Sequence, residues 1–177
     1  MSKILILYTS KYGSARRYAE MLSETLGARN SVTLSELKKF KGNPGDYDKI
    51  IYGAGIKAYE MYDYKKFKRL VKNVDRINTL VVVYAVGMMS ATKNYAVRLI
   101  EKNRVSGDVK FFYLRGAIDL DKLKGFDGSI VKHLVSSLMM REDLTEDEKA
   151  FVAACLHSKD WVCKENIERI VEYINEK

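Results

Sequence analysis

An apolar run near the N-terminus leads through a short polar loop straight into an amphipathic helical pattern. The run spans residues 4–8, with the length and the β-branched and aromatic content of a strand buried on both faces. From Ala15 to Leu26, apolar residues recur at three- and four-residue spacing, as on one face of a helix. This arrangement gathers unpaired backbone N–H groups and the positive end of the helix at one point, where phosphate binds well.

The loop between this strand and this helix carries side chains that suit a phosphate group. Hydroxyls, a cation and a glycine without Cβ allow many hydrogen bonds to one dianion. The candidate phosphate-binding residues are Thr9, Ser10, Lys11, Tyr12, Gly13, Ser14 and Ala15. The sequence contains no GxxxxGK[ST] and no GxGxxG after the first strand, which argues against a nucleoside triphosphatase and a leading dinucleotide fold. From the loop alone, an ordinary strand-to-helix turn of a parallel sheet remains the alternative.

Four further apolar runs indicate strands, and helical patterns lie between most of them. The further strands are expected at residues 31–34, 49–52, 79–86 and 109–114. Helices are expected at residues 15–26, 35–41, 62–74 and from Ser90 or Thr92 to about 100. Parallel strands need crossover connections, and these are right-handed. The pattern therefore predicts one α/β domain, a doubly wound five-stranded parallel sheet of order 2-1-3-4-5 with helices on both faces.

In this strand order the ligand crevice lies at the carboxyl ends of strands 1, 3 and 4. The loops there are residues 9–15, 53–62 and 87–93, and each contains glycine. Small residues let the backbone approach a flat ring, tyrosines can stack on it and methionines give adaptable apolar contacts, although ordinary packing is the alternative for each. The candidates in the second and third loops are Gly53, Ala54, Gly55, Ile56, Lys57, Tyr59, Val86, Gly87, Met88, Met89 and Ser90.

Several other kinds of site do not fit the sequence. The GxGxxA that begins at Gly53 follows the third strand, so we discount a dinucleotide fingerprint. Response-regulator receivers need acidic residues after the first and third strands, where this chain has Thr9 and Gly53. The two histidines are isolated, and the two cysteines lie eight residues apart, which matches neither a zinc site nor a CxxC pair. The sequence shows no convincing acid–base pair, activated nucleophile or metal cluster, so any chemistry must come from a cofactor.

The charge balance and the apolar runs narrow the partners and the location. Lysine and arginine number 31 against 23 acidic residues, a net charge of +8, which favours anionic ligands and anionic membrane surfaces. No nucleic-acid motif accompanies the basic clusters, so we expect no nucleic-acid partner. The apolar runs are too short for a signal peptide or a transmembrane segment. We therefore expect a cytoplasmic protein.

The residues after the fifth strand exceed what a minimal domain of this kind needs. We expect residues 117–160 to be an added segment, loop-like over residues 120–126, with a helix over residues 126–140. Thr145 and Glu148 have the form of a capping box for a helix to about residue 157. A final helix carries Ile167, Ile170, Val171 and Ile174.

The phosphate loop resembles the FMN-phosphate loop of flavodoxins, in which the pattern is roughly [ST]xTGxT. Ser10, Gly13 and Ser14 match that frame, whereas Tyr12 and Ala15 stand where the family usually has threonines. The whole chain resembles the flavodoxin-domain family that contains bacterial menaquinone-dependent protoporphyrinogen dehydrogenase. The resemblance is carried by residues 8–13 (YTSKYG), residues 53–57 (GAGIK) and the extension after Gly116-Ala117, which contains Phe126-Asp127 and Asp160-Trp161.

The resemblance implies that residues 1–177 form a single flavodoxin-like domain that binds FMN, and three functions remain open. One is a flavin-dependent dehydrogenase of an anionic, protoporphyrinogen-like substrate with a quinone acceptor, associated peripherally with the inner face of an anionic membrane. The second is a flavodoxin-type electron shuttle to protein partners. The third is a non-enzymatic binding domain that has lost FMN, which the departures at Tyr12 and Ala15 keep open. Residues 87–92 lack the aromatic residue with which flavodoxins usually sandwich the flavin, which suggests a more open ring.

Overall fold

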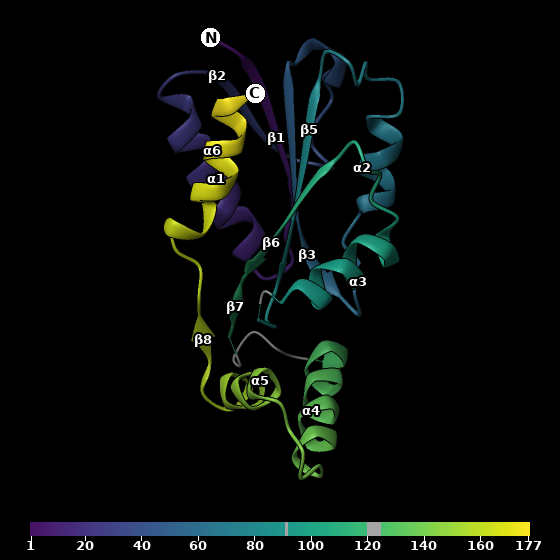
Figure 1. Cartoon of the computed structure of the whole chain (residues 1–177), viewed down its shortest axis with the longest axis vertical. Coiled ribbons are helices and arrows are strands. Elements are labelled where there is room, and N and C mark those ends of the chain that lie inside the picture. The colour runs from purple at the N-terminus through teal and green to yellow at the C-terminus, as the bar shows by residue number, and fades with distance from the viewer. Residues whose placement is uncertain (91, 120–124) are drawn as a thin grey trace.

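A computed structural model describes residues 1–90, 92–119 and 125–177 (Figure 1). Parallel strands form a sheet in the order β2-β1-β3-β5-β6, and the short strand β4 pairs antiparallel with β3. In chain order the parallel strands take the positions 2-1-3-4-5, so the predicted topology is confirmed. The strands are β1 (Lys3–Thr9), β2 (Ser31–Glu36), β3 (Lys49–Lys57), β4 (Glu60–Met61), β5 (Leu80–Gly87) and β6 (Lys110–Arg115).

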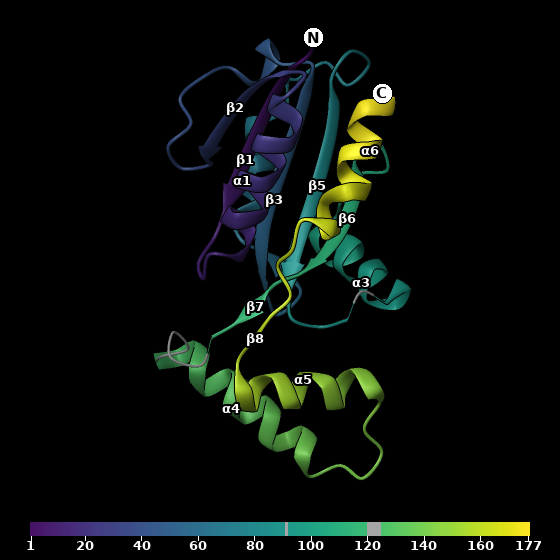
Figure 2. The same ribbon diagram turned by 90° about the vertical axis from the view of Figure 1, so that its left-hand side faces the viewer.

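Helices cover both faces of this sheet (Figures 1 and 2). On one face pack α1 (Ser14–Gly27) and α6 (Glu168–Glu176), and on the other pack α2 (Tyr64–Leu70) and α3 (Lys93–Asn103). Successive side chains of β1 point to opposite faces, so Ile4 and Ile6 join the first cluster while Leu5 and Leu7 join the second. All four are fully buried, which explains why this strand has no polar alternation.

Two helices extend beyond the carboxyl ends of the strands (Figures 1 and 2). We call α4 (Gly125–Met139) and α5 (Glu146–His157) the helical unit. It is joined to the rest of the chain through the antiparallel pair β7 (Ala117–Ile118) and β8 (Lys159–Asp160). Its own apolar cluster contains Ile118, Val135, Leu138, Phe151, Ala154 and Cys155. The predicted helix over residues 126–140 and the capping box of Thr145 and Glu148 are confirmed.

Three expected elements differ from the structure. Residues 53–57 continue β3 instead of forming a loop, because the strand runs on to pair with β4. The helix expected over residues 62–74 is confined to α2, since Asp63 before it has a φ of 53° and Val71 after it leaves the helical conformation. The short helix expected over residues 35–41 is absent from this described stretch, where β2 reaches Glu36 and a turn follows.

The rest of the described chain agrees with the expected order. Thr92 caps α3 by accepting a hydrogen bond from the Tyr95 N–H, and two short 3-10 helices, η1 and η2, occupy Pro44–Asp46 and Glu165–Ile167. Most of the loop expected over residues 120–126 lies outside the described residues, as does residue 91 of the third predicted loop. Within the part of the chain that the structure describes, no helix is both long and apolar enough to cross a membrane.

Candidate functional site

A cavity of about 940 Å³ opens between the carboxyl ends of the central strands and the helical unit. All three predicted loops contribute to its lining, together with β7, β8 and the helical unit. The lining residues are 10–15, 55–59, 86–89, 116–119 and 158–160, with Arg17, Tyr62, Tyr95, Ile130, Val131, Leu134, Leu138, Glu148 and Phe151. The winding of the sheet thus brings most of the predicted site residues to one place.

Four of the predicted site residues do not line the cavity. The Thr9 hydroxyl lies 3.1 Å from the Tyr52 hydroxyl. Gly53 and Ala54 are buried within β3. Ser90 lies beyond the lining residues of the third loop, where its carbonyl accepts a hydrogen bond from the Thr92 N–H. The small residues at the end of β3 serve strand packing at Gly53 and Ala54 and border the cavity only from Gly55 onward.

The loop before α1 makes a sharp turn at Gly13. Gly13 has a φ of +99°, which L side chains rarely adopt, and its N–H donates to the Ser10 hydroxyl at 3.1 Å. The helix then begins at Ser14 with no side-chain cap. The Ser14 hydroxyl accepts a hydrogen bond from the Ala117 N–H at 3.0 Å, so its own proton remains to be donated. Lys11 and Tyr12 complete this wall of the cavity.

Aromatic side chains form a second wall. Tyr59 follows β3, Tyr95 lies in the first turns of α3, and their ring centroids are 5.3 Å apart. Tyr95 in turn packs edge-on against Tyr113 at 5.1 Å. Burial raises the pKa of Tyr95 to about 12. Sequence reasoning missed Tyr95 because its spacing made it one residue of a helix face.

The helical unit forms the third wall, which is largely apolar. Ile130, Leu134 and Leu138 from α4 and Phe151 from α5 line the cavity. Ile130 and Leu134 remain 43% and 44% exposed. The periodicity of α4 predicted an ordered helix, but it contains no information about which surface that helix meets. These residues are therefore absent from the sequence-based site.

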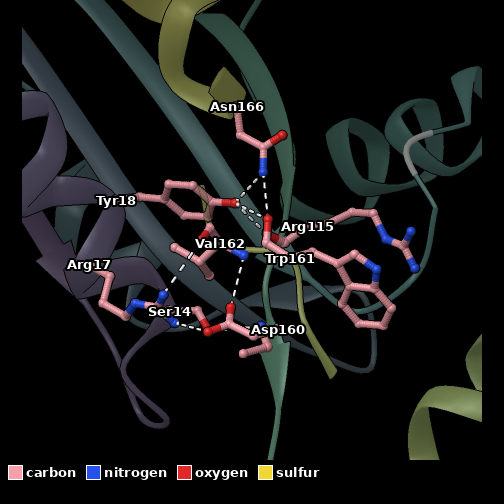
Figure 3. Close-up of polar contacts among 9 residues, drawn as sticks. Ser14, Arg17, Tyr18, Arg115, Asp160, Trp161, Val162 and Asn166 are labelled. Atoms are coloured by element: carbon pink, nitrogen blue, oxygen red, sulfur yellow. Dashed lines mark hydrogen bonds and ion pairs between the residues drawn. The ribbon is translucent and has the colours of Figure 1, made fainter. Parts of the chain in front are cut away.

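Hydrogen bonds join α1 and the end of β6 to the segment that follows β8 (Figure 3). The Tyr18 hydroxyl donates to the Arg115 carbonyl at 2.6 Å and accepts from the Asn166 amide at 2.7 Å. The same amide donates to the Trp161 carbonyl, and the Trp161 N–H donates to the Gly116 carbonyl. A tyrosine of α1 thus joins the end of β6 to the segment that follows β8.

Charged side chains reinforce this junction (Figure 3). The Arg17 guanidinium lies 2.7 Å from the Asp160 carboxylate, and the Arg115 guanidinium stacks on the Trp161 ring at 3.8 Å. Partial desolvation by itself would raise the pKa of Asp160. Hydrogen bonds from the Val162 N–H and from Arg17 outweigh it, so the pKa of Asp160 is lowered. Helix α1, the end of β6, β8 and the segment after β8 therefore form one connected network.

The remaining candidate groups lie apart from one another. His133 and His157 are exposed on the helical unit, Cys155 is buried within it and Cys163 is exposed beyond it. Across residues 1–90, 92–119 and 125–177, no three histidine, cysteine or acidic side chains gather in a way that could hold a metal ion. What the described arrangement offers is a loop at the start of a helix, an aromatic wall and a largely apolar wall from the helical unit, all around one cavity.

Comparison with known proteins connects this arrangement to a family. A family model described as "Flavodoxin domain" matches residues 5–162. No curated protein matches the sequence. Among solved structures, the chain is similar to oxidised Flavodoxin 2 from Bacillus cereus, with 21% identity, coverage of 87% of this chain and 95% of that chain, and a TM-score of 0.45. It is also similar to azoreductase from Bacillus anthracis str. Sterne, with 10% identity, coverage of 88% and 100%, and a TM-score of 0.41.

Proposed function

The chain belongs to the flavodoxin-domain family, and from this membership we propose an FMN-dependent oxidoreductase whose small-molecule substrate enters the cavity beneath the helical unit. FMN is the cofactor that family membership indicates. When bound, FMN supplies the electron-transfer chemistry that the described side chains lack. The protein's own contribution is to hold the phosphate, place the ring and enclose the substrate.

The residues of the phosphate loop fit the phosphate of FMN. The uncapped start of α1 offers backbone N–H groups and the positive end of the helix dipole. Ser10 and Ser14 add hydroxyls, and Lys11 adds a positive charge on the same wall of the cavity. Tyr12 and Ala15 leave this geometry intact: Tyr12 is exposed, and the buried methyl group of Ala15 packs in the core. These features favour retention of FMN over a domain that has lost it.

The helical unit is the observation that favours an enzyme over an electron shuttle. Ligand cavities commonly enclose about 300–1,000 Å³, and this cavity lies near the upper end of that range at about 940 Å³. Its far wall is made mostly of apolar side chains of α4 and α5, together with Glu148 of α5, rather than of cofactor loops. Such a wall suits a second, apolar molecule beside the ring. A shuttle, by contrast, needs an open edge against which a partner protein can dock.

The net charge and the resemblance together support a more specific substrate. A positive chain attracts anionic ligands. Among the described residues, four basic ones line the cavity, Lys11, Arg17, Lys57 and Lys159, against three acidic ones, Asp119, Glu148 and Asp160. We therefore propose a flat, apolar substrate with anionic groups, of the porphyrinogen kind, and a quinone as electron acceptor reached at an anionic membrane surface. Oxidation of such a porphyrinogen with reduction of a soluble quinone by the purified protein tests this reaction.

The cofactor site is tested by two isosteric substitutions at Gly13. Gly13→Asn and Gly13→Asp impose the same strain at a φ of +99°, but only aspartate adds a negative charge beside the expected phosphate. We expect both variants to bind FMN more weakly than the parent, and Gly13→Asp about tenfold more weakly than Gly13→Asn, a difference of about 1.4 kcal/mol. Absorbance titration measures this, and equal affinities of the two variants would place the phosphate elsewhere.

The substrate wall is tested by a matched pair of leucines on the helical unit. Leu134 lines the cavity and is 44% exposed, whereas Leu156 on α5 is 51% exposed and lies outside the lining. We expect Leu134→Glu to raise the KM for the porphyrinogen about tenfold or more while FMN affinity is unchanged, because a charge then lies in the apolar wall. Leu156→Glu is the control and should leave both constants unchanged. Equal KM values for the porphyrinogen in the two variants would favour the electron shuttle instead.

A further inference from the structure

The hairpin between β3 and β4 turns through two residues in an unfavourable backbone conformation. Lys57 pairs with Glu60, so Ala58 and Tyr59 are the two central residues of the turn. Their φ angles are 48° and 65°, a region that glycine enters freely and residues with a Cβ enter rarely. Two-residue turns of this kind favour Asn-Gly for that reason. Contacts outside the turn must therefore maintain it.

Asn103 provides such contacts from the last residue of α3. Its side-chain oxygen accepts a hydrogen bond from the Met61 N–H, and its amide nitrogen donates to the Tyr59 and Leu99 carbonyls, each at 2.8 Å. These partners fix the orientation of the Asn103 amide: its oxygen must face the Met61 N–H, and its nitrogen must face the two carbonyls. Asn103 is only 9% exposed. One buried side chain thus bonds to the turn and to the strand that follows it.

The turn that Asn103 holds carries Tyr59 to the cavity. The Tyr59 ring is 38% exposed, so its own packing constrains it only partly. It lies beside Tyr95, which belongs to the same helix as Asn103. Helix α3 therefore sets the position of both rings, one directly and the other through the amide of Asn103. Asn103 itself does not line the cavity.

We propose that Asn103 is a positioning residue of the cofactor site, which holds the left-handed turn so that the Tyr59 ring contacts the flat ring of bound FMN. This inference rests on the proposed function. It predicts that loosening the turn will weaken the contact between Tyr59 and the ligand while the phosphate loop, on the other side of the cavity, stays unchanged.

Asn103→Asp is the most direct test, because aspartate keeps the size of the side chain and the acceptor for Met61 but loses both donated hydrogen bonds. We expect FMN to bind roughly three- to tenfold more weakly, the range that corresponds to the loss of one aromatic contact. We also expect the fluorescence of the bound flavin to rise, because a stacked tyrosine quenches it. Adding Ala58→Gly should restore part of both properties, because glycine adopts the turn without the amide's help.

Lys102→Ala is the matched control. It removes the 3.6 Å ion pair with Glu60, which joins the same helix to the same hairpin, but it leaves the amide in place. We expect its FMN affinity and flavin fluorescence to equal those of the parent. Tyr59→Leu should reproduce the losses of Asn103→Asp, and combining the two should add no further loss. A merely structural role for Asn103 would give losses that add.

A second route avoids the buried residue in case Asn103→Asp does not fold. Ala58→Val places a β-branched side chain at a positive φ on the exposed turn, and we expect it to cause the same two losses. Hydrogen exchange of the Met61 amide, measured without FMN, reports whether Asn103 still holds the strand that follows the turn. Faster exchange in Asn103→Ala, which also removes the acceptor for the Met61 N–H, together with parental FMN affinity and fluorescence would overturn the proposal and leave the FMN function standing. A parent that binds no FMN would overturn the proposed function, and this role with it.

Discussion

Gly53 lies directly beneath the ring of Tyr84 from the neighbouring strand. A Cβ added at Gly53 would lie 1.8 Å from the Tyr84 Cζ and 2.1 Å from its hydroxyl oxygen. Tyr84 is fully buried, and its hydroxyl donates to the Ala15 carbonyl at the start of α1. The Tyr84 side chain therefore passes over Gly53 and connects the centre of the sheet to the phosphate loop. It can do so because Gly53 has no side chain.

We expect Gly53→Ala to lower the free energy of unfolding by about 1–3 kcal/mol, because the added methyl group forces Tyr84 out of place. Urea denaturation measures this change. Gly27→Ala serves as the control, since its Cβ would meet no atom within 4 Å, and its unfolding free energy should stay within about 1 kcal/mol of the parent. A Gly53→Ala protein as stable as the parent would contradict the close approach of Tyr84.

The same glycine shows where prediction from residues reaches its limit. Gly53 and Gly55 both looked suited to a flat ligand, because a glycine indicates that something approaches the backbone closely. At Gly53 the approaching group is the ring of Tyr84. At Gly55, which borders the cavity, it is the ring of Tyr62, whose Cδ2 would lie 3.3 Å from an added Cβ. The identity of the approaching group depends on the neighbouring strand and on its register. Tyr95 was missed for the same reason, since its neighbours come from other elements.

At the scale of elements, the junction of β7 and β8 depends on the charge of Asp160. Its pKa is lowered in the folded protein, so its stabilising contribution is present above the unfolded value of about 3.9 and is lost as the pH falls through the lowered folded value. The pair with Arg17 is about half exposed, so we expect a contribution of about 0–1 kcal/mol.

The prediction is therefore a small but specific pH dependence. Between pH 6 and pH 3, the parent should lose up to about 1 kcal/mol more unfolding free energy than Asp160→Asn, whose side chain does not titrate. Denaturation at several pH values measures the difference. Identical curves for parent and Asp160→Asn would contradict a role for this charge.

Local signals predicted elements well, whereas the positions of elements depended on long-range contacts. The capping box of Thr145 and the helical spacing before residue 140 lie within one element, so the sequence contains all that defines them. The extension of β3 to Lys57 depends on pairing with β4 and on the amide of Asn103, 42 residues away from Met61. The end of α2 likewise depends on φ angles that no periodicity reveals.

At the scale of the whole molecule, the topology of the sheet could be predicted, but the position of α4 and α5 along the cavity could not. Alternating strands and helices restrict the topology to a few choices, and the crevice follows from the point where the winding reverses. The side chains of α4 and α5 that line the cavity come from residues 130–151, far along the chain from the loops they face. Nothing in an amphipathic pattern identifies its partner surface.

The net charge of +8 bears on the redox potential of the bound cofactor. Lys57 lines the cavity, and a cation near the ring stabilises the negative charge gained on reduction by about 1 kcal/mol at 4 Å in water. For a two-electron couple, about 1.4 kcal/mol corresponds to about 30 mV. We therefore expect Lys57→Glu to lower the two-electron potential by about 30–60 mV, because the change removes a cation and adds an anion.

A spectroelectrochemical titration of both proteins with FMN bound measures this shift. Lys65→Glu makes the same change of net charge on α2, outside the lining of the cavity, and should move the potential much less. Equal shifts in the two variants would mean that overall charge matters rather than the position of Lys57. An unchanged potential in Lys57→Glu would argue against a cation beside the ring.

The pairing of β7 with β8 has a consequence for how such a chain can diversify. Ala117 lies opposite Asp160 and Ile118 opposite Lys159, so the chain departs from the sheet and returns to it at one point. The segment between β7 and β8 therefore begins and ends at neighbouring positions. A segment inserted between two paired strands can be lengthened, shortened or exchanged without changing the structure of the sheet, α6 or the phosphate loop. One cofactor-binding scaffold can thus acquire different substrates by recombination at a single pair of adjacent positions.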